Sequence, residues 1–421
     1  MSPRGVRHAV APTLTHVSGI VAMGVALLAA AGSLAAAADG FTPIAGWDRH
    51  LFPAYLIATA TARPSAEAQK QAQGEHLLGD PLGVLGVAVV APADNAAVKV
   101  TILSDSIMQP TTAAVVLPKK GVQYKVLPTI KYDYAALVRS RQTVPLSVTY
   151  RVEMAGQEAQ EETVKVTLRS INDCPMAYAE GHGATDVSFC FAAYVNEGHP
   201  LLDRILQEAL RTGAVDSFQG RPGATDDGDE DESPRLVLRQ VYALWHVLCQ
   251  RGVRYSDITT TVGTSQAIAS QHVRLLDESL ANTQANCVDG SVLFASLLRK
   301  IGIEPFLVCV PHHCYVGFFL DDDEEHPVAL ETTMLGSTGE PDGDTTLEGI
   351  ENVVDGRWAR TASWATFAAA VRTGTENLKK DSQKFTSEKD EDDDYYLIVI
   401  EQARELGILP IPFSSATVAK E

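Results

Sequence analysis

The hydrophobic pattern of this 421-residue chain changes from a strand-like to a helix-like period after residues 172–175. Over residues 82–168, short apolar runs are separated by Pro, Gly, Asp and Asn, and residues 146–152 alternate apolar with polar side chains, as half-buried strands do. Residues 236–253 instead carry apolar side chains at intervals of three and four, which is the period of an amphipathic helix. The change predicts an all-β sandwich-like domain over residues 79–171, followed by an α+β domain over residues 172–421.

Three further segments are assigned by composition. Residues 39–78 hold an aromatic patch followed by a polar stretch rich in Ala, Gln and Glu, and we interpret them as an N-terminal arm and linker. Residues 221–234 form an acidic, glycine-containing insert between two predicted helices. Residues 364–371 and 396–406 have helical spacing, which predicts a helical C-terminal tail.

A cysteine stands at the predicted start of a helix in the second domain. Asn286 is a strong N-cap residue, apolar residues follow it at helical spacing, and Gly302 stands where such a helix would stop. Cys287 therefore falls in the first turn, where free N–H groups and the positive end of the helix dipole favour thiolate over thiol. Asp289 is expected to point away from the sulfur, because its charge would oppose the thiolate. The pattern favours a nucleophilic cysteine.

Strand-like runs follow this helix at residues 305–310, 313–320 and 328–331. In the second run, His313 shares a face with a glycine, which we expect to give room beside the histidine, whereas the opposite face is uniformly apolar and suited to burial. An acidic turn would return the chain as an antiparallel neighbour and bring Glu331 beside His313. The order of these residues predicts a nucleophile in Cys287, a base in His313 and a carboxylate in Glu331 that fixes the imidazole tautomer.

The residues that carry this order resemble the transglutaminase-like superfamily. They are Asn-Cys-Val-Asp-Gly-Ser-Val-Leu-Phe-Ala-Ser-Leu-Leu-Arg-Lys-Ile-Gly-Ile at 286–303, His-Cys-Tyr-Val-Gly at 313–317 and Leu-Glu-Thr-Thr at 330–333. The resemblance covers roughly residues 190–335 and is tightest over 284–335.

The resemblance implies a papain-like core with a Cys-His-Asp/Glu triad formed by Cys287, His313 and Glu331. Many members have Asp where this chain has Glu331, and Trp where it has Tyr315. The superfamily is typical of exported bacterial proteins, and it includes both hydrolases and members that have lost activity.

Gln284 is a candidate oxyanion donor. It precedes Cys287 by three residues, and a side-chain amide close to the nucleophile is the kind of donor that a tetrahedral intermediate requires. The backbone N–H of Cys287 would be the second donor. An ordinary loop residue is the alternative interpretation of Gln284.

Neighbours of His313 offer an alternative base and an alternative site. His312 is the alternative base, but on an extended strand it would share the apolar face of Cys314, which favours His313. Cys309, His312, His313 and Cys314 are metal-ligand residue types, yet their side chains would diverge to opposite strand faces. No second Cys/His pair completes a tetrahedral zinc site. We therefore expect no metal and no organic cofactor.

Six cysteines are sparse for a disulfide scaffold of this length. If Cys287 is kept as a thiol, five remain and at least one more is unpaired. Cys174 and Cys190 form the pair considered for a bridge. The sequence leaves open the pairing of the five, and most are interpreted as small buried apolar residues: Cys174, Cys190, Cys249, Cys309 and Cys314.

Residues 1–38 have the order of a secretory signal peptide. Basic residues precede an apolar stretch over about residues 17–38, which ends in three alanines before Asp39. We predict cleavage after Ala38 and export to the periplasm or the cell exterior. An uncleaved membrane anchor is the alternative, because the apolar stretch is long. No later segment is long and apolar enough to span a bilayer.

The net charge of −19 argues against nucleic acid and anionic membrane surfaces as partners, since there is no basic stripe to neutralise phosphates. Much of the excess lies in acidic runs at residues 226–232, 321–325 and 390–394, which are typical of solvated loops. None of the three has the regular ligand spacing of a calcium loop.

Together the residues and the resemblance predict an exported, thiol-dependent hydrolase that acts on peptide or isopeptide amides. The reaction would pass through a thioester at Cys287, which water then resolves. The expected partner is a peptide or protein substrate, with the cell envelope as one source. Two alternatives stay open: a non-catalytic binding or assembly module that retains the fold, and a transamidase that cross-links proteins.

Overall fold

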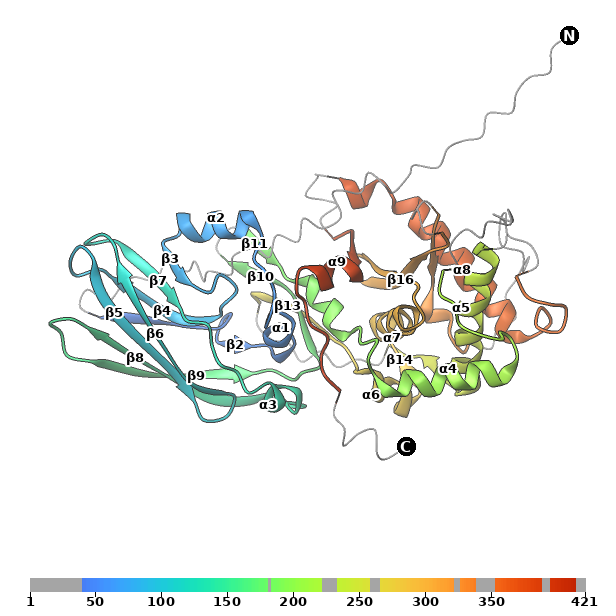
Figure 1. Ribbon diagram of the computed structural model, residues 1–421, viewed down its shortest axis with the longest axis horizontal. Coiled ribbons are helices and arrows are strands. Elements are labelled where there is room, and N and C mark those ends of the chain that lie inside the picture. The colour runs from blue at the N-terminus through green and yellow to red at the C-terminus, as the bar shows by residue number, and fades with distance from the viewer. Residues whose placement is uncertain are drawn as a thin grey trace, which may run out of the picture. The chain divides into compact units, whose positions relative to one another are not determined.

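A computed structural model describes residues 40–180, 183–221, 233–257, 266–321, 326–337, 353–387 and 394–413. The expected signal peptide, and all but the ends of the acidic insert at 221–234, lie outside these residues. The chain forms two compact units, whose elements are labelled in Figure 1. Among the described residues, we call 197–257 and 279–401 the cysteine unit, and we call 40–196, 266–278 and 402–413 the β-unit. The protein is thus of the α+β class.

Two sheets dominate the β-unit. The five-stranded sheet has the order β2 (His50–Leu51), β9 (Gln160–Leu168), β8 (Val144–Met154), β5 (Ala96–Ser104) and β6 (Met108–Leu117). The four-stranded sheet has the order β1 (Phe41–Ala45), β4 (Leu85–Val90), β7 (Gln123–Leu127) and β3 (Leu77–Gly79). Strand β8 alternates buried and exposed side chains, as its sequence predicted. The buried Tyr150 hydroxyl of β8 donates to the Ile44 carbonyl of β1 at 3.0 Å and so ties the two sheets together.

Residues 39–78 differ from the expected arm and linker. From residue 41 on they supply β1, β2 and β3 together with α1 (Pro53–Ala58) and α2 (Ala66–Gly74). The aromatic side chains of Trp47, Phe52 and Tyr55 are almost fully buried, and every residue of α1 is buried. The physical reason is that three large apolar rings bury enough surface to fix the segment in the core of the β-unit.

A third sheet extends the β-unit past the boundary expected at residue 171. It has the order β11 (Gly183–Asp186), β10 (Asp173–Glu180) and β13 (Ile268–His272). The short helices α3 (Tyr134–Val138) and η2 (Ser188–Tyr194) also belong to this unit. The first division between the units therefore lies at 196/197. Two helices span later divisions: α6 (Leu276–Asn282) spans the one at 278/279, and α9 (Ile400–Glu405) spans the one at 401/402.

The cysteine unit is built on one antiparallel sheet. Its order is β17 (Pro327–Leu330), β16 (His313–Phe319), β15 (Pro305–Val310) and β18 (Tyr396–Val399). Helix α7 (Cys287–Lys300) contacts β15 and β16, while α8 (Ala362–Asp381) contacts β17. The remaining elements of the unit are α4 (Pro200–Thr212), α5 (Ser233–Gln250), β12 (Arg254–Tyr255), β14 (Gln284–Ala285), η3 (Thr332–Met334) and η4 (Lys384–Thr386).

The expected helical tail is only partly helical. Residues 364–371 lie within α8, but residues 396–399 form strand β18, and only the following residues form α9. Strand β18 pairs with β15 from Phe306↔Val399 to Cys309↔Tyr396. The apolar run Tyr-Leu-Ile-Val pairs with the free edge of β15 and therefore forms a strand, although its spacing together with that of α9 also fits a helix.

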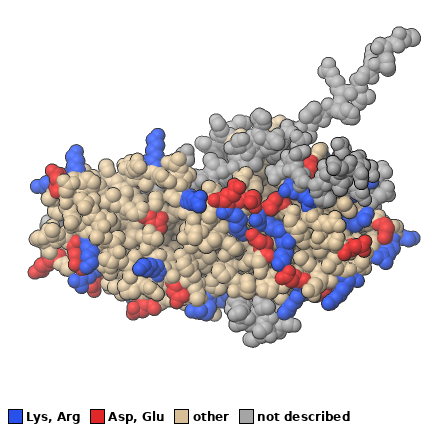
Figure 2. All heavy atoms as spheres, in the orientation of Figure 1, with Lys and Arg blue, Asp and Glu red and all other residues tan. Residues whose placement is uncertain are grey.

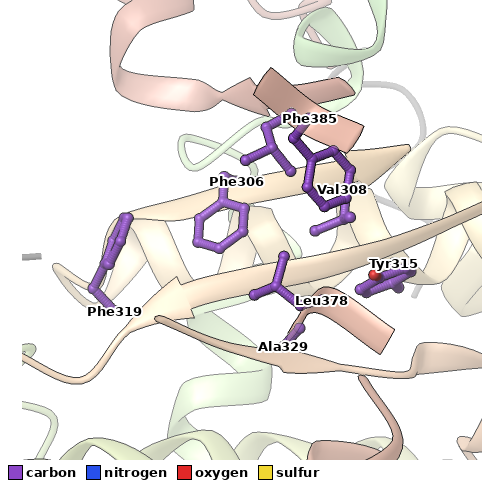
Figure 3. Close-up of a cluster of buried hydrophobic side chains, with 8 residues drawn as sticks. Phe306, Val308, Tyr315, Phe319, Ala329, Leu378 and Phe385 are labelled. Carbon is purple, nitrogen blue, oxygen red and sulfur yellow. The ribbon is translucent and has the colours of Figure 1, made fainter. Parts of the chain in front are cut away.

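Both faces of strand β16 are covered. The face of His313 carries Tyr315 and Phe319, which join a hydrophobic cluster with Phe306, Val308, Ala329, Leu378, Phe385 and Leu397 (Figure 3). A Cβ atom at Gly317 would lie 2.2 Å from the Phe306 ring, so this glycine makes room for an aromatic side chain and not for the chemistry of His313. Our expectation that the glycine gives room beside the histidine is therefore wrong.

Charged side chains of both signs lie close together on the face drawn in Figure 2. Within the cysteine unit, Arg299 of α7 forms ion pairs with three carboxylates, those of Glu197, Glu304 and Glu401. In the part of the chain that the structure describes, no helix combines the length and the apolar character needed to cross a membrane.

Candidate active site

Helix α7 begins at Cys287 because its first turn is capped from both directions. The Asp289 N–H donates to the Asn286 side-chain oxygen at 2.8 Å, and the Asn286 N–H donates to the Asp289 carboxylate at 2.9 Å. The Asp289 carboxylate thus serves the cap and is completely buried. Cys287 is the first helical residue and is half-buried. Because Cys287 lies in the first turn, no carbonyl of the helix precedes it to accept a hydrogen bond from its N–H.

His313 is the first residue of β16, immediately after a two-residue turn closed by the Val310↔His313 pair. Its ring packs at 5.8 Å, centroid to centroid, from the ring of Tyr315. His312 lies in the turn with a φ of 62° and is exposed. It therefore does not share the buried face of Cys314, which was the placement that we expected for the alternative base.

Glu331 follows the last residue of β17 and caps the short helix η3. Its N–H donates to the Ala370 carbonyl of α8 at 3.0 Å, which fixes the backbone. One carboxylate oxygen, Oε1, accepts from the N–H of Thr333 at 3.2 Å and from its hydroxyl at 2.7 Å. The other, Oε2, lies 2.8 Å from Nε2 of His313. Glu331 is 6% exposed, so this carboxylate is held by protein groups on both oxygens.

The imidazole of His313 joins the cysteine to the carboxylate. Hydrogen bonds to Cys287 and then to Glu331 raise the pKa of His313 to about 10, against the opposing effect of burial. Because Glu331 occupies Nε2, Nδ1 is the ring nitrogen available to the sulfur. The three predicted residues thus lie in the order Cys287, His313, Glu331, and they come from a helix start, a strand start and a strand end.

The charge state of Glu331 supports the same arrangement. Burial on its own raises the pKa of Glu331, but the hydrogen bond from His313 and those from Thr333 outweigh burial, and the pKa is lowered overall. A carboxylate is therefore present beside the imidazole at neutral pH. The pair favours a positively charged imidazolium, which is the form that can stabilise a neighbouring thiolate.

Gln284 lies on strand β14, which pairs in parallel with β12 to form a two-stranded sheet. Its side chain is exposed, and its role as an oxyanion donor stays a prediction. Tyr255 of β12 pairs with Ala285, two residues before the cysteine. Burial, followed by the charges of Cys287, Asp257 and Glu331, raises the pKa of Tyr255.

Sequence reasoning missed Tyr255 and Thr333 as residues of the site. Tyr255 comes from a strand more than thirty residues before the nucleophile, so no local pattern links the two. Thr333 lies only two residues after Glu331, and this short separation was the one local signal for their contact. Tertiary structure brings Tyr255 beside Ala285, whereas Thr333 meets Glu331 through a local contact.

The other cysteines lie outside the triad. All six thiols are free, including Cys174 and Cys190, which were considered for a bridge. The Cys309 and Cys314 sulfurs lie 3.9 Å apart on paired strands and are buried. Within the described ranges, no group of three or more His, Cys, Asp or Glu side chains is placed to hold a metal ion.

A scan against protein-family models gave no match, and a search of curated proteins gave none. The functional argument for this chain therefore depends on its own residues and their geometry.

Proposed function

We propose that the protein is a transglutaminase-like cysteine hydrolase that cleaves peptide or isopeptide amides through a thioester at Cys287. The observation that carries the proposal is the 2.8 Å contact between Nε2 of His313 and the buried Glu331 carboxylate, and the pKa of this imidazole is raised by Cys287 as well as by Glu331. Nucleophile, base and orienting carboxylate in one line are the minimum required for thiol-based acyl transfer.

In the first half-reaction, the Cys287 thiolate attacks the amide carbon and a C–S bond forms. The His313 imidazolium gives its proton to the departing nitrogen as the C–N bond breaks, which leaves a thioester and a neutral imidazole. The imidazole then takes a proton from water, whose oxygen attacks the thioester carbon. The C–S bond breaks, the sulfur leaves as thiolate, and the product is a carboxylic acid.

Each neighbouring group has a defined part in these steps. Glu331 holds Nε2 of the ring and stabilises its positive charge, which leaves Nδ1 as the nitrogen available to the sulfur. The first-turn N–H of Cys287 is available to stabilise the tetrahedral oxyanion, with Gln284 as the second candidate donor. The proposal includes export, on the basis of residues 1–38, and a peptide or protein substrate, including one from the cell envelope. We favour water over an amine as the second reactant because an exported enzyme is surrounded by water.

Alkylation by iodoacetamide near pH 7 tests the nucleophile. Cys249 of α5 is the matched control, because it is also a half-buried thiol and burial raises its pKa. We expect Cys287 to react at least about tenfold faster than Cys249, and we expect His313→Ala to remove this advantage. Equal, slow labelling of both cysteines would instead favour a non-catalytic binding module.

Incubation with a library of peptides and cell-wall fragments tests the reaction. Mass spectrometry should show fragments that gain the mass of water with the native protein but not with Cys287→Ala. Covalent multimers that disappear in Cys287→Ala would favour the transamidase instead.

A further inference from the structure

The hydroxyl group of Ser291 lies where the three segments of the triad meet. Ser291 stands one helical turn after Cys287 and is completely buried. Its Oγ donates to the Cys287 carbonyl at 2.6 Å, has the Cys314 carbonyl at 3.3 Å and lies 3.4 Å from the hydroxyl of Thr332. Since Cys314 follows His313 and Thr332 follows Glu331, one hydroxyl reaches the segment of every member of the triad.

Local structure explains why Cys314 is within reach of Ser291. The pairing of β16 with β17 runs from Phe319↔Pro327 to Val316↔Leu330 and then stops. At Cys314 the strand therefore has a partner only on the β15 side, at Cys309. On the side where β17 has ended, the Cys314 carbonyl lies near the Ser291 hydroxyl and not near another strand.

A glycine explains why Thr332 is within reach. A Cβ atom at Gly290 would lie 2.9 Å from Oγ1 and 3.0 Å from Cβ of Thr332, so the segment after Glu331 packs against α7 at a point where only glycine fits easily. Thr332 Oγ1 also lies 3.4 Å from the Cys287 carbonyl. Ser291 has one proton to give, and the shortest contact assigns it to Cys287. The Thr332 proton is then available for the Ser291 oxygen or the Cys287 carbonyl.

We propose that Ser291, with Thr332 as its partner, is a positioning residue that holds the sulfur, the imidazole and the carboxylate in register. Acyl transfer depends on this register, because a displacement of about 1 Å in a catalytic group can cost about 100-fold in rate. As a statement about rate, the inference rests on the proposed function. As a statement about how the three segments are held together, it stands on the contacts of Ser291 and Thr332 alone.

Helix α7 provides a matched control. Ser296 is also completely buried, and its Oγ donates to the carbonyl four residues before it, that of Val292, at 2.6 Å. Ser291→Ala and Ser296→Ala thus remove the same kind of intrahelical bond from the same helix. Ser291 differs in that its Oγ also lies 3.3 Å from the Cys314 carbonyl and 3.4 Å from Oγ1 of Thr332, in the segments that follow His313 and Glu331.

Two readouts separate positioning from simple stability. The first is the pKa of His313, followed by NMR in protein labelled at the histidine rings and assigned with His313→Asn. The second is the rate at which iodoacetamide alkylates Cys287. For Ser291→Ala we expect the His313 pKa to fall below about 10 and alkylation to slow about tenfold, while Ser296→Ala leaves both at the native values. Identical results for the two variants overturn the proposal.

Thr332→Val covers the case in which Ser291→Ala does not fold, because it removes a hydroxyl with little change of shape. A lowered His313 pKa in this variant supports the proposal, and an unchanged pKa overturns it. The fate of the proposed function is read separately, from amide cleavage by the native protein. If the native protein cleaves no amide but Ser291→Ala shifts the His313 pKa, the positioning role is supported and the hydrolase function is rejected. If the native protein cleaves amides but Ser291→Ala leaves the His313 pKa unchanged, the hydrolase function is supported and the positioning role is rejected.

Discussion

Nε2 of His313 lies 2.8 Å from Oε2 of Glu331, a carboxylate that is 6% exposed. The other oxygen of Glu331 is held by both polar groups of Thr333. The imidazole therefore faces a charge that can neither turn away nor be screened by bulk water. Most of the behaviour expected of this site follows from that contact.

Glu331→Gln should lower the pKa of His313 from about 10, because it removes the negative charge that favours the imidazolium. The imidazolium must protonate the leaving amine, so the acylation rate should fall as pH rises through the His313 pKa. In the variant this decline should begin at lower pH, and the rate at neutral pH should drop about 100-fold. Rate profiles from pH 6 to 11 measure both effects. A decline at the same pH in both proteins would contradict the assignment of Glu331.

Thr333→Val should leave the Glu331 carboxylate with its backbone donor but without the hydroxyl donor at 2.7 Å. Loss of a hydrogen bond to a charged group raises the pKa of that carboxyl and loosens its hold on the histidine. We expect amide cleavage to slow about tenfold. Thr333→Ser keeps the hydroxyl and is the control, so equal rates for Thr333→Val and Thr333→Ser would argue against an orienting role.

Gly290→Ala should push Thr332 away from α7, because the new methyl would lie about 3 Å from the Thr332 side chain. The helix itself gains about 1 kcal/mol from alanine, whereas overpacking costs about 1–3 kcal/mol. We expect a net loss of stability in urea unfolding, together with slower alkylation of Cys287. Gly356→Ala is the control, since a Cβ atom there meets nothing within 4 Å. A Gly290→Ala protein that matches Gly356→Ala in both measurements would show that the close approach is unimportant.

Asn286→Ala should remove the side-chain acceptor that caps α7 and leave the Asp289 N–H without it. Loss of such a cap costs about 0.5–2 kcal/mol of stability. The first turn carries Cys287, so alkylation of this cysteine should slow in parallel. Asn286→Ser can still cap and should recover most of the stability. Equal unfolding midpoints for the alanine and serine variants would speak against the cap.

Local signals in the sequence were sufficient for the elements that carry the triad. The N-cap at Asn286 and the apolar spacing behind it predicted α7, and short strand-like runs predicted β15 and β16. The acidic turn predicted the return of the chain that brings Glu331 to His313. Each of these is a property of a few consecutive residues, which is why it can be read without a structure.

The features that the sequence did not predict depend on distant partners. Residues 396–399 became a strand because β15 offered them an edge, and residues 173–180 joined the β-unit because β10 pairs with β13 about ninety residues later. The contacts of Ser291 and Thr332 likewise require two segments more than forty residues apart. Periodicity carries no information about such pairs.

The last described residues of the chain complete the β-unit, which the first described residues begin. The Leu409 N–H donates to the Ala58 carbonyl at 3.0 Å, and the Ile411 N–H donates to the Ala193 carbonyl at 2.7 Å. On the ribosome, this unit stays unfinished until the whole cysteine unit has been synthesised. A fragment beginning at residue 172 would consequently contain all the described residues of the cysteine unit, but it would also carry β10, β11 and β13 without the rest of the β-unit. Separating the chemistry from the rest of the molecule requires two cuts and a new linker, not a single truncation.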